Sequence, residues 1–237
     1  MINVNLYSLF LDKHYITQSF VDRWSKVLCK NSNLLIQYPV CPPYFFENKI
    51  DDDKYSIMFV GQSTGSWEYF TTIIEGMEIT YNFLLNQKYS SYFWNFTDYV
   101  EEYINGPTNR PRLNYYWSNL FKIVDPNGNM VKDTSFIDEY IKSIQTLTYE
   151  IDIVKPDVLI FLTGPTLDNC LNSLFDNVTF YPMNGLNNVL YKMTAGNNSM
   201  YFPEYTYKTY HPQYLYKGQG MGVNIVQKIC DIIKNDI

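Results

Sequence analysis

The chain has 237 residues, of which 46% are hydrophobic and 18% aromatic, and this composition excludes a disordered chain because it supplies enough apolar surface for a packed core. Its 18 Lys and Arg residues against 24 Asp and Glu residues give a net charge of −6, which argues against tight non-specific binding to nucleic acid through bulk electrostatics. A local basic groove remains compatible with this charge.

The length favours a single domain over residues 1–237, with residues 1–54 as an N-terminal helical lead-in packed on it. No apolar segment is long enough to span a bilayer. The N-terminal sequence MINVNLYSLFLDKHY also lacks the basic start and apolar core of a signal peptide. We therefore expect a soluble cytoplasmic protein that does not associate with a membrane, and we expect a monomer.

The cysteines lie far apart and form no CxxC pair, so the sequence predicts neither a zinc site nor an iron–sulfur cluster. Reduced, mostly buried thiols are the simpler interpretation, and we expect no metal and no cofactor. The four cysteines are Cys29, Cys41, Cys170 and Cys230.

The first element in chain order is a helix within residues 16–28. A proline-punctuated connection over residues 38–54 follows, and its acidic end leads into a strand. Four segments in all predict buried strands. They are SIMFV at 56–60, a weaker segment within NYYWSNLFKIV at 114–124, VLIFLT at 158–163 and TYKTY at 206–210.

Helices are predicted between these strands and after the last one. Residues 136–154 carry apolar side chains at helical spacing, Ser135 with Asp138 forms a capping-box pattern, and Lys155-Pro156 ends the helix. The last helix follows the glycine-rich KGQGMG and places one apolar stripe at Val223, Val226, Cys230 and Ile233.

The alternation of strands and helices predicts a three-layer α/β/α fold around a central, mainly parallel four-stranded sheet. In such a sheet, ligands bind beyond the carboxyl ends of the strands. Four chemically different turns are therefore expected to meet at one edge. They carry Gly61-Gln62-Ser63, Asn119, Thr163-Gly164-Pro165 and His211-Pro212.

His211 is one of only two histidines, and the other, His14, lies in an undistinguished N-terminal segment. His211 follows a predicted strand and opens HPQYLYKGQG, in which a fixed proline and later glycines indicate a shaped loop. A lone histidine is more often a structural hydrogen-bonding residue than a catalytic one. Position alone therefore leaves both interpretations open.

Four segments in order resemble the motifs of the uracil-DNA glycosylase superfamily over residues 55–235. They are GQSTGSW after a strand, Asn119 in YYWSNLFKIVDPNGN, the strand VLIFLTGP, and HPQYL after the last strand. The resemblance implies the fold of that superfamily. It also implies a first loop that holds the sugar and the attacking water, an asparagine that reads the base, and a histidine-proline loop that supports the leaving base and inserts an apolar wedge.

The resemblance assigns catalytic roles to His211, Gln62 and Ser63. His211 would hydrogen-bond the base oxygen as negative charge develops on the leaving base, and the backbone of Gln62 would lie near the base. Ser63 departs from the pattern, because many relatives carry aspartate, glutamate or asparagine at or beside this position, where a carboxylate orients water and stabilises the cationic sugar. Three alternatives follow: Glu68 or Asp98 supplies the carboxylate, Ser63 only positions water and catalysis is slower, or the fold is kept without hydrolysis.

The resemblance also assigns base recognition to Asn119, whose amide offers both a donor and an acceptor to one base edge. The alternative is that Asn119 only caps a turn. A flipped base further needs a flat apolar surface, which a nearby aromatic residue would supply, although in a chain this aromatic each such residue also fits the core. The predicted substrate-binding residues are Asn119, Gly61, Trp67, Phe93, Trp94 and Gly164.

DNA contacts are predicted at two places. Leu215 matches the wedge leucine, with Tyr214 beside it and Lys217 continuing the likeness, although an ordinary apolar loop residue would explain Leu215 equally well. Arg110 and Arg112 form the best local candidate for a phosphate-facing patch, with a solvated loop as the alternative.

Together the residues and the resemblance predict a monofunctional DNA glycosylase that flips a base out of DNA and hydrolyses its N-glycosidic bond, leaving an abasic site. The expected base is uracil or a bulkier modified pyrimidine, in DNA repair or in defence against phages. The alternative is a module of the same fold that binds nucleic acid, a nucleotide or a protein without cleavage, which the uncharged Ser63 favours. A glycosidase or transferase acting on free nucleosides is a third interpretation.

Overall fold

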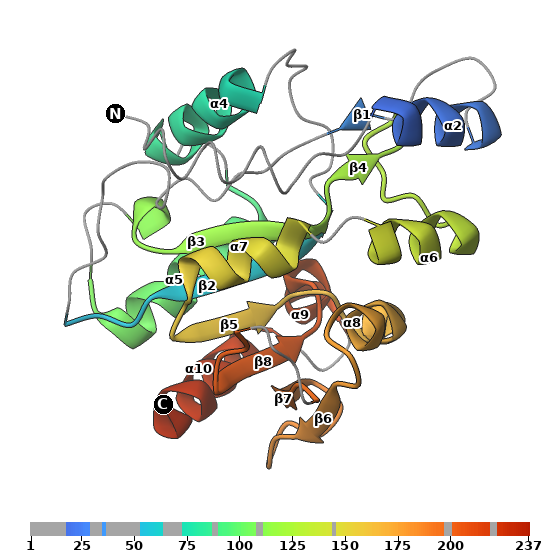
Figure 1. Cartoon of the computed structure of the whole chain (residues 1–237). Coiled ribbons are helices and arrows are strands. Elements are labelled where there is room, and N and C mark those ends of the chain that lie inside the picture. Colours follow the sequence, from blue (N-terminus) through green and yellow to red (C-terminus); the bar gives the residue numbers. More distant parts are fainter. Residues whose placement is uncertain are drawn as a thin grey trace.

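The protein is an α/β structure with a six-stranded, mostly parallel sheet flanked by helices (Figure 1). All structural statements concern the residues that the computed structural model describes. These are residues 18–28, 35–36, 53–63, 73–86, 90–107, 111–143, 146–196, 201–218 and 222–237.

The strand order in the sheet is β3-β2-β5-β8-β7-β6. The first four strands in this order are mutually parallel, and they are the four strands that the sequence predicts. Their apolar residues are buried on both faces, as is typical of the centre of a parallel sheet. They are β2 (Ile57–Ser63), β3 (Tyr116–Phe121), β5 (Val158–Phe161) and β8 (Tyr205–Thr209).

Two further strands correct the predicted four-stranded sheet. β7 (Leu190–Thr194) pairs antiparallel with β8, and β6 (Thr179–Pro182) pairs antiparallel with β7 at the sheet edge. β6 is largely exposed, and in β7 only Leu190 and Met193 are buried, so no continuous buried apolar run marks either strand in the sequence. The overlooked signal is Asn184-Gly185 between them, because this dipeptide favours hairpin turns, and Gly185 has a φ of +81°.

A second, two-stranded sheet joins the N-terminal part of the chain to the main sheet. β1 (Leu35–Ile36) pairs antiparallel with β4 (Ile123–Val124), which closely follows β3. Helix α2 (Gln18–Leu28) packs against the segment that follows β4 in the chain. There the centre of the Trp24 ring lies 5.4 Å from the centre of the Phe136 ring. This contact fits the predicted packing of the N-terminal segment on the main domain.

Helices cover both faces of the sheet with two separate apolar cores. One core includes Met58 and Leu159 with helices α2, α6, α7 and α8, and the other includes Phe59 and Ile160 with α4, α5, α9 and α10. Alternate residues of each strand point to opposite faces, which explains this division. In Figure 1, α7 crosses the sheet on the viewer's side and α5 lies behind the same strands.

The remaining helices have the following bounds. On the first face are α6 (Thr134–Ser143), α7 (Thr146–Val154) and α8 (Asp168–Leu174), with the short 3-10 turn η2 (Pro165–Leu167) before α8. On the second are α4 (Ile73–Asn86), α5 (Tyr92–Asn105), α9 (Pro212–Lys217) and α10 (Val223–Asp236), and the 3-10 turn η1 (Pro111–Leu113) precedes β3.

The predicted helix over 136–154 forms as two helices, α6 and α7. The carboxylate of Asp133 accepts a hydrogen bond from the Phe136 amide at 2.9 Å, so this residue and not Ser135 caps α6. The predicted stop before Lys155-Pro156 is confirmed, and Val226, Cys230 and Ile233 of the predicted apolar stripe are buried in the last helix. The side chain of Val223 lies outside the described part of the structure. None of the described helices is long and apolar enough to cross a membrane.

The order of the parallel strands locates a ligand-binding edge. Along the chain, β2 is followed by β3 and then by β5, but in the sheet β2 lies between these two strands. The connection from β2 to β3 and the connection from β3 to β5 therefore run in opposite directions across the sheet. Crevices form where the strand order reverses in this way, outside the carboxyl ends of the strands. In this sheet the reversal lies at β2 and β5, which end next to Ser63 and Thr163.

Candidate functional site

Gly61 and Asn119 are partners in the register of β2 and β3, at the carboxyl edge of the sheet. A Cβ atom placed on Gly61 would lie 2.2 Å from Asn119 Oδ1 and 3.3 Å from Phe93 Cε2. A side chain at position 61 would therefore displace both groups. Glycine is required here so that the carboxamide and the ring can pack onto the backbone of β2.

The amide nitrogen of Asn119 is a buried donor without a partner. Asn119 is 2% exposed, and its Nδ2 makes no hydrogen bond to any group of the described chain. Such a group costs about 1–3 kcal/mol when it stays unsatisfied, so a buried donor of this kind is usually satisfied by water or by a bound molecule. Asn119 can donate this hydrogen bond to an acceptor on a bound molecule.

Phe93 reaches the edge of the sheet from the first turn of α5. The Ser91 hydroxyl caps this helix by accepting a hydrogen bond from the Trp94 amide at 3.4 Å, which fixes the direction of the first turn. The Phe93 ring is half-buried and lies 6.3 Å from the His211 ring, with 31° between the two planes. Phe93 thus links the Gly61 and Asn119 pair to His211.

His211 follows β8 and caps the N-terminus of α9. Its Nδ1 accepts a hydrogen bond from the Gln213 amide at 3.2 Å, and Pro212 occupies the first helical position. An accepting Nδ1 places the imidazole proton on Nε2. Burial lowers the pKa of His211, so the ring is neutral at physiological pH and carries one N–H donor.

Gln62 and Gly164 shape the backbone between the central strands. Gln62 Nε2 donates to the carbonyl oxygen of Thr163 at 2.8 Å and so joins the end of β2 to the end of β5. Gly164 has a φ of +68°, and its amide donates to the Thr209 carbonyl at 3.0 Å. Both residues lie at the predicted edge, and their observed contacts are structural.

Ser63 is the last residue of β2 and is half-buried. Of the two carboxylates considered as its replacement, Asp98 accepts hydrogen bonds from Arg112 Nε at 3.1 Å and from the Tyr115 hydroxyl at 2.8 Å. Burial raises the pKa of Asp98, and these two contacts oppose that rise. The carboxylate of Asp98 is thus engaged with Arg112 and Tyr115, and Glu68 lies outside the described residues.

Two predicted contact residues belong to the core. Trp94 is buried between the rings of Phe83 and Trp117, so it is not a wall that a base can reach. The buried guanidinium of Arg112 lies 5.0 Å from the Trp94 ring and pairs with Asp98, which corrects its assignment to a phosphate-facing patch. Trp67 and Arg110, which were also assigned to these roles, lie outside the described residues.

The predicted wedge is also buried. Leu215 is 0% exposed and packs in the core beneath α9, so its side chain does not fit insertion into a duplex. Tyr214, next to it, is 51% exposed and stacks on Tyr210 with 4.6 Å between ring centres. Lys217 is exposed at the end of the same helix.

Sequence reasoning missed Tyr210 and the Gln213 amide. Tyr210 immediately precedes His211, and the Gln213 amide fixes the tautomer of the imidazole. The pattern of a polar residue followed by proline is a helix-start signal, and it indicates that the His211 side chain is bonded to the backbone. No group of three His, Cys, Asp or Glu residues in the described ranges could hold a metal ion.

No protein-family model matches the chain, and no curated protein or solved structure matches it significantly. The function is therefore inferred from the geometry at Gly61, Phe93, Asn119 and His211. The likeness to the uracil-DNA glycosylase superfamily rests on the four motifs and their order.

Proposed function

We propose that this protein is a DNA glycosylase with the fold of the uracil-DNA glycosylase superfamily. The observation that carries the proposal is the buried, unpartnered Nδ2 of Asn119 at a site that also contains the neutral His211. Further support comes from the strand order, which puts both residues at the carboxyl edge beside the reversal at β2 and β5.

Base recognition would use a stacking surface and two donors. The half-buried Phe93 ring offers an apolar face to a flipped base. Asn119 Nδ2 and His211 Nε2 each supply an N–H group, and these would meet acceptors on the base edge. A pyrimidine with two carbonyl oxygens, such as uracil or a modified relative, satisfies both donors.

Bond cleavage would proceed by departure of the base with the electron pair of the N-glycosidic bond. Negative charge then develops on the base oxygen, where the Nε2–H of neutral His211 donates a hydrogen bond that strengthens as the charge grows. The cationic sugar carbon takes up a water molecule, and as the hydroxyl of the abasic site forms the water gives its proton, through solvent, to the departed base anion. The Ser63 hydroxyl would hold that water.

Ser63 makes the proposed reaction slow on an ordinary base, because a hydroxyl lacks the negative charge that would stabilise the cationic sugar. A base that leaves readily, with its negative charge spread by electron-withdrawing groups, would depend less on this charge. The proposal therefore favours a modified pyrimidine as substrate over uracil itself.

A second candidate function is base binding without cleavage. It is favoured by the uncharged end of β2 and by the engagement of Asp98 with Arg112 and Tyr115. The Ser63→Asp variant separates the two functions. In an enzyme limited by this position, it should raise the rate of uracil release by at least about tenfold, whereas in a binding module it should produce no release.

The test is base release from single- and double-stranded oligonucleotides that carry uracil, common lesions or phage-type modified pyrimidines, scored by alkaline cleavage at abasic sites. Release of one base, lost in Asn119→Ala, supports the glycosylase. Binding of one base without release, also lost in Asn119→Ala, supports the binding module. Neither release nor binding by folded protein would refute both.

A further inference from the structure

Two tyrosine pairs and a lysine involve residues at or next to α9, and one of these pairs joins α9 to the start of α5. Tyr210 and Tyr214 stack at 4.6 Å, and Tyr92 and Tyr216 lie 5.4 Å apart with 31° between their planes. The ammonium group of Lys217 lies 5.1 Å from the centre of the Tyr92 ring. We call these five residues the tyrosine surface.

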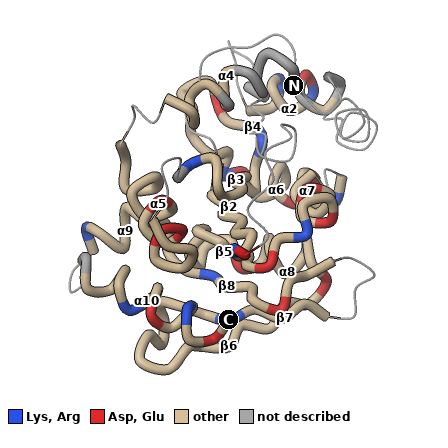
Figure 2. Tube along the Cα trace, turned by 90° about the vertical axis from the view of Figure 1, so that its left-hand side faces the viewer, with Lys and Arg blue, Asp and Glu red and all other residues tan. Residues whose placement is uncertain are grey.

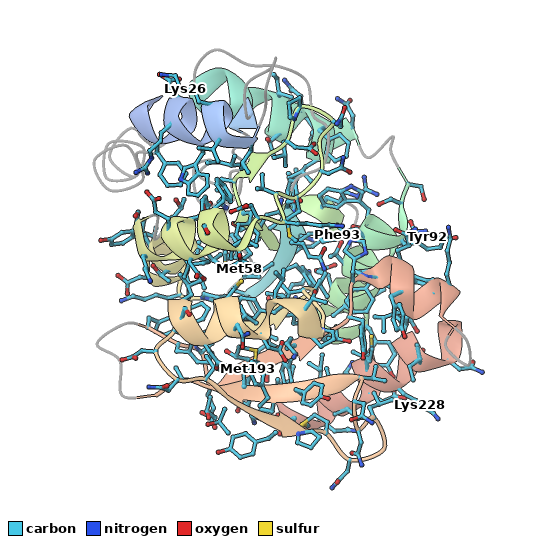
Figure 3. All side chains as sticks on the ribbon, turned by 90° about the vertical axis from the view of Figure 1, so that its right-hand side faces the viewer. Lys26, Met58, Tyr92, Phe93, Met193 and Lys228 are labelled. Atoms are coloured by element: carbon cyan, nitrogen blue, oxygen red, sulfur yellow. The ribbon has the colours of Figure 1, made fainter. Side chains whose placement is uncertain are left out.

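The tyrosine surface offers both aromatic area and charge to solvent. Tyr214 is 51% exposed and Tyr92 is 38% exposed. Lys217 is exposed and makes no ion pair with a carboxylate of the described chain. Figure 3 shows Tyr92 at the surface of the molecule and Phe93 turned toward its interior.

Each tyrosine pair begins next to a residue of the candidate site. Tyr92 precedes Phe93 at the start of α5, and Tyr210 precedes His211 at the start of α9. Each pair therefore has one tyrosine that is a single residue away, along the chain, from a residue of the candidate site.

The surface fits single-stranded rather than duplex DNA. Bases of a single strand stack on exposed aromatic rings, whereas a duplex hides its bases and is held mainly through phosphates. The chain has a net charge of −6, and Figure 2 shows its described basic residues interspersed with acidic ones along the trace. The buried Leu215 also leaves no wedge at this position to hold a duplex open.

We propose that the tyrosine surface binds the nucleotides of single-stranded DNA that flank the nucleotide held at Asn119 and His211. The proposal rests on the proposed function in placing DNA at this edge of the sheet. Tyr214 is the principal stacking residue, because its ring is the more exposed of the two solvent-facing tyrosines. Lys217 contacts a phosphate.

The test measures binding by fluorescence anisotropy with a labelled oligodeoxythymidine and with a duplex of the same length. The single strand should bind more tightly, and Tyr214→Ala should weaken its binding by about tenfold, whereas Tyr214→Phe keeps the ring and the affinity. Lys217→Gln should lower the salt dependence of binding. Tyr181→Ala is the matched control, because Tyr181 is 52% exposed on the distant strand β6 and should not affect binding.

Several results would overturn this proposal. They are equal affinity for duplex and single strand, an unchanged affinity in Tyr214→Ala, or no DNA binding at all. A change of oligomeric state in Tyr214→Ala without loss of DNA binding would instead assign the surface to a protein interface. This experiment measures DNA binding and not base release, so the two proposals can fail separately. If the protein binds single-stranded DNA through Tyr214 but releases no base, the glycosylase proposal is refuted and the proposal for the tyrosine surface stands.

Discussion

The carboxamide of Asn119 occupies the space that a side chain on Gly61 would need, with Oδ1 2.2 Å from the position of a Cβ atom. The two residues face each other across neighbouring parallel strands, so neither backbone can move without disturbing the sheet. Asn119 is thereby held with its free Nδ2 at the sheet edge.

Gly61→Ala should displace Asn119 and abolish base binding. It should also lower the free energy of unfolding by about 1–3 kcal/mol, because the added methyl group overpacks a buried site. Urea denaturation and a base-binding titration measure the two effects. The double variant Gly61→Ala/Asn119→Ala removes the clash and should recover most of the stability but not the binding. Wild-type binding by Gly61→Ala would contradict this account of the site.

His211→Ser should change how stability depends on pH. Burial lowers the pKa of His211 in the folded protein below its ordinary value of 6.5. Below about pH 6.5 the imidazole is therefore protonated in the unfolded chain while it is still largely neutral in the folded chain. The wild type therefore loses stability as pH falls from there through the lowered pKa. Serine also caps helices but does not titrate, so the variant should lose less stability over this range. Parallel pH profiles from thermal denaturation would contradict the prediction.

Glu101 should impose the opposite pH dependence. Both of its carboxylate oxygens are buried, and this burial raises the pKa of Glu101 from 4.5 to about 7, although nearby Lys54 and Asn105 lower it. The folded chain therefore keeps this proton while the unfolded chain releases it, and stability falls as pH rises from about 4.5 to 7.

Glu101→Gln should remove this fall, because glutamine resembles the protonated acid and does not titrate. The variant should gain stability relative to the wild type at pH values above about 7, as measured by urea denaturation. Glu102→Gln, at the exposed neighbouring position, is the matched control and should change the difference in stability between acidic and alkaline pH only slightly, because Glu102 is the weaker of the two negative charges that raise the pKa of Glu101. Equal profiles for all three proteins would contradict a buried, protonated Glu101.

The Lys122 and Glu150 pair should show the behaviour of a buried ion pair. Lys122 Nζ lies 3.0 Å from Glu150 Oε2, both side chains are fully buried, and the Ser118 hydroxyl contacts both. Glu150→Gln leaves a buried ammonium group without its counter-charge and should cost about 3–5 kcal/mol of unfolding free energy. Replacing both, as in Lys122→Met/Glu150→Leu, should recover most of this loss. A double variant as unstable as the single would refute the interpretation.

The parallel part of the sheet was predictable because its strands are apolar runs buried on both faces. Val158 to Phe161 illustrates this pattern, since every residue of β5 is buried. β6 and β7 lack such a run. β7 pairs with β8 and β6 pairs with β7, so only the Asn184-Gly185 turn between β6 and β7 marks them. Whether a segment joins a sheet edge depends on partners distant in the sequence.

The candidate site could be predicted in part, because motif order placed Gly61, Asn119 and His211 at strand ends that the fold brings to one edge. The roles of Trp94, Arg112 and Leu215 could not be read from the same motifs. Their burial depends on tertiary neighbours, such as Asp98 for Arg112. Trp94, Thr97, Glu101 and Ile104 lie at helical spacing on the buried side of α5, but Thr97 and Glu101 are polar, so hydrophobic periodicity does not mark this side in the sequence.

The most direct test of the central claim is single-turnover base release from an oligonucleotide that carries the preferred base, compared between the wild type and His211→Ser. Serine preserves a helix cap, so the variant should remain folded by circular dichroism. Loss of the neutral Nε2–H donor should slow release by about a hundredfold or more while base binding through Asn119 persists. Equal rates in the two folded proteins would contradict the proposed role of His211 and with it the glycosylase mechanism.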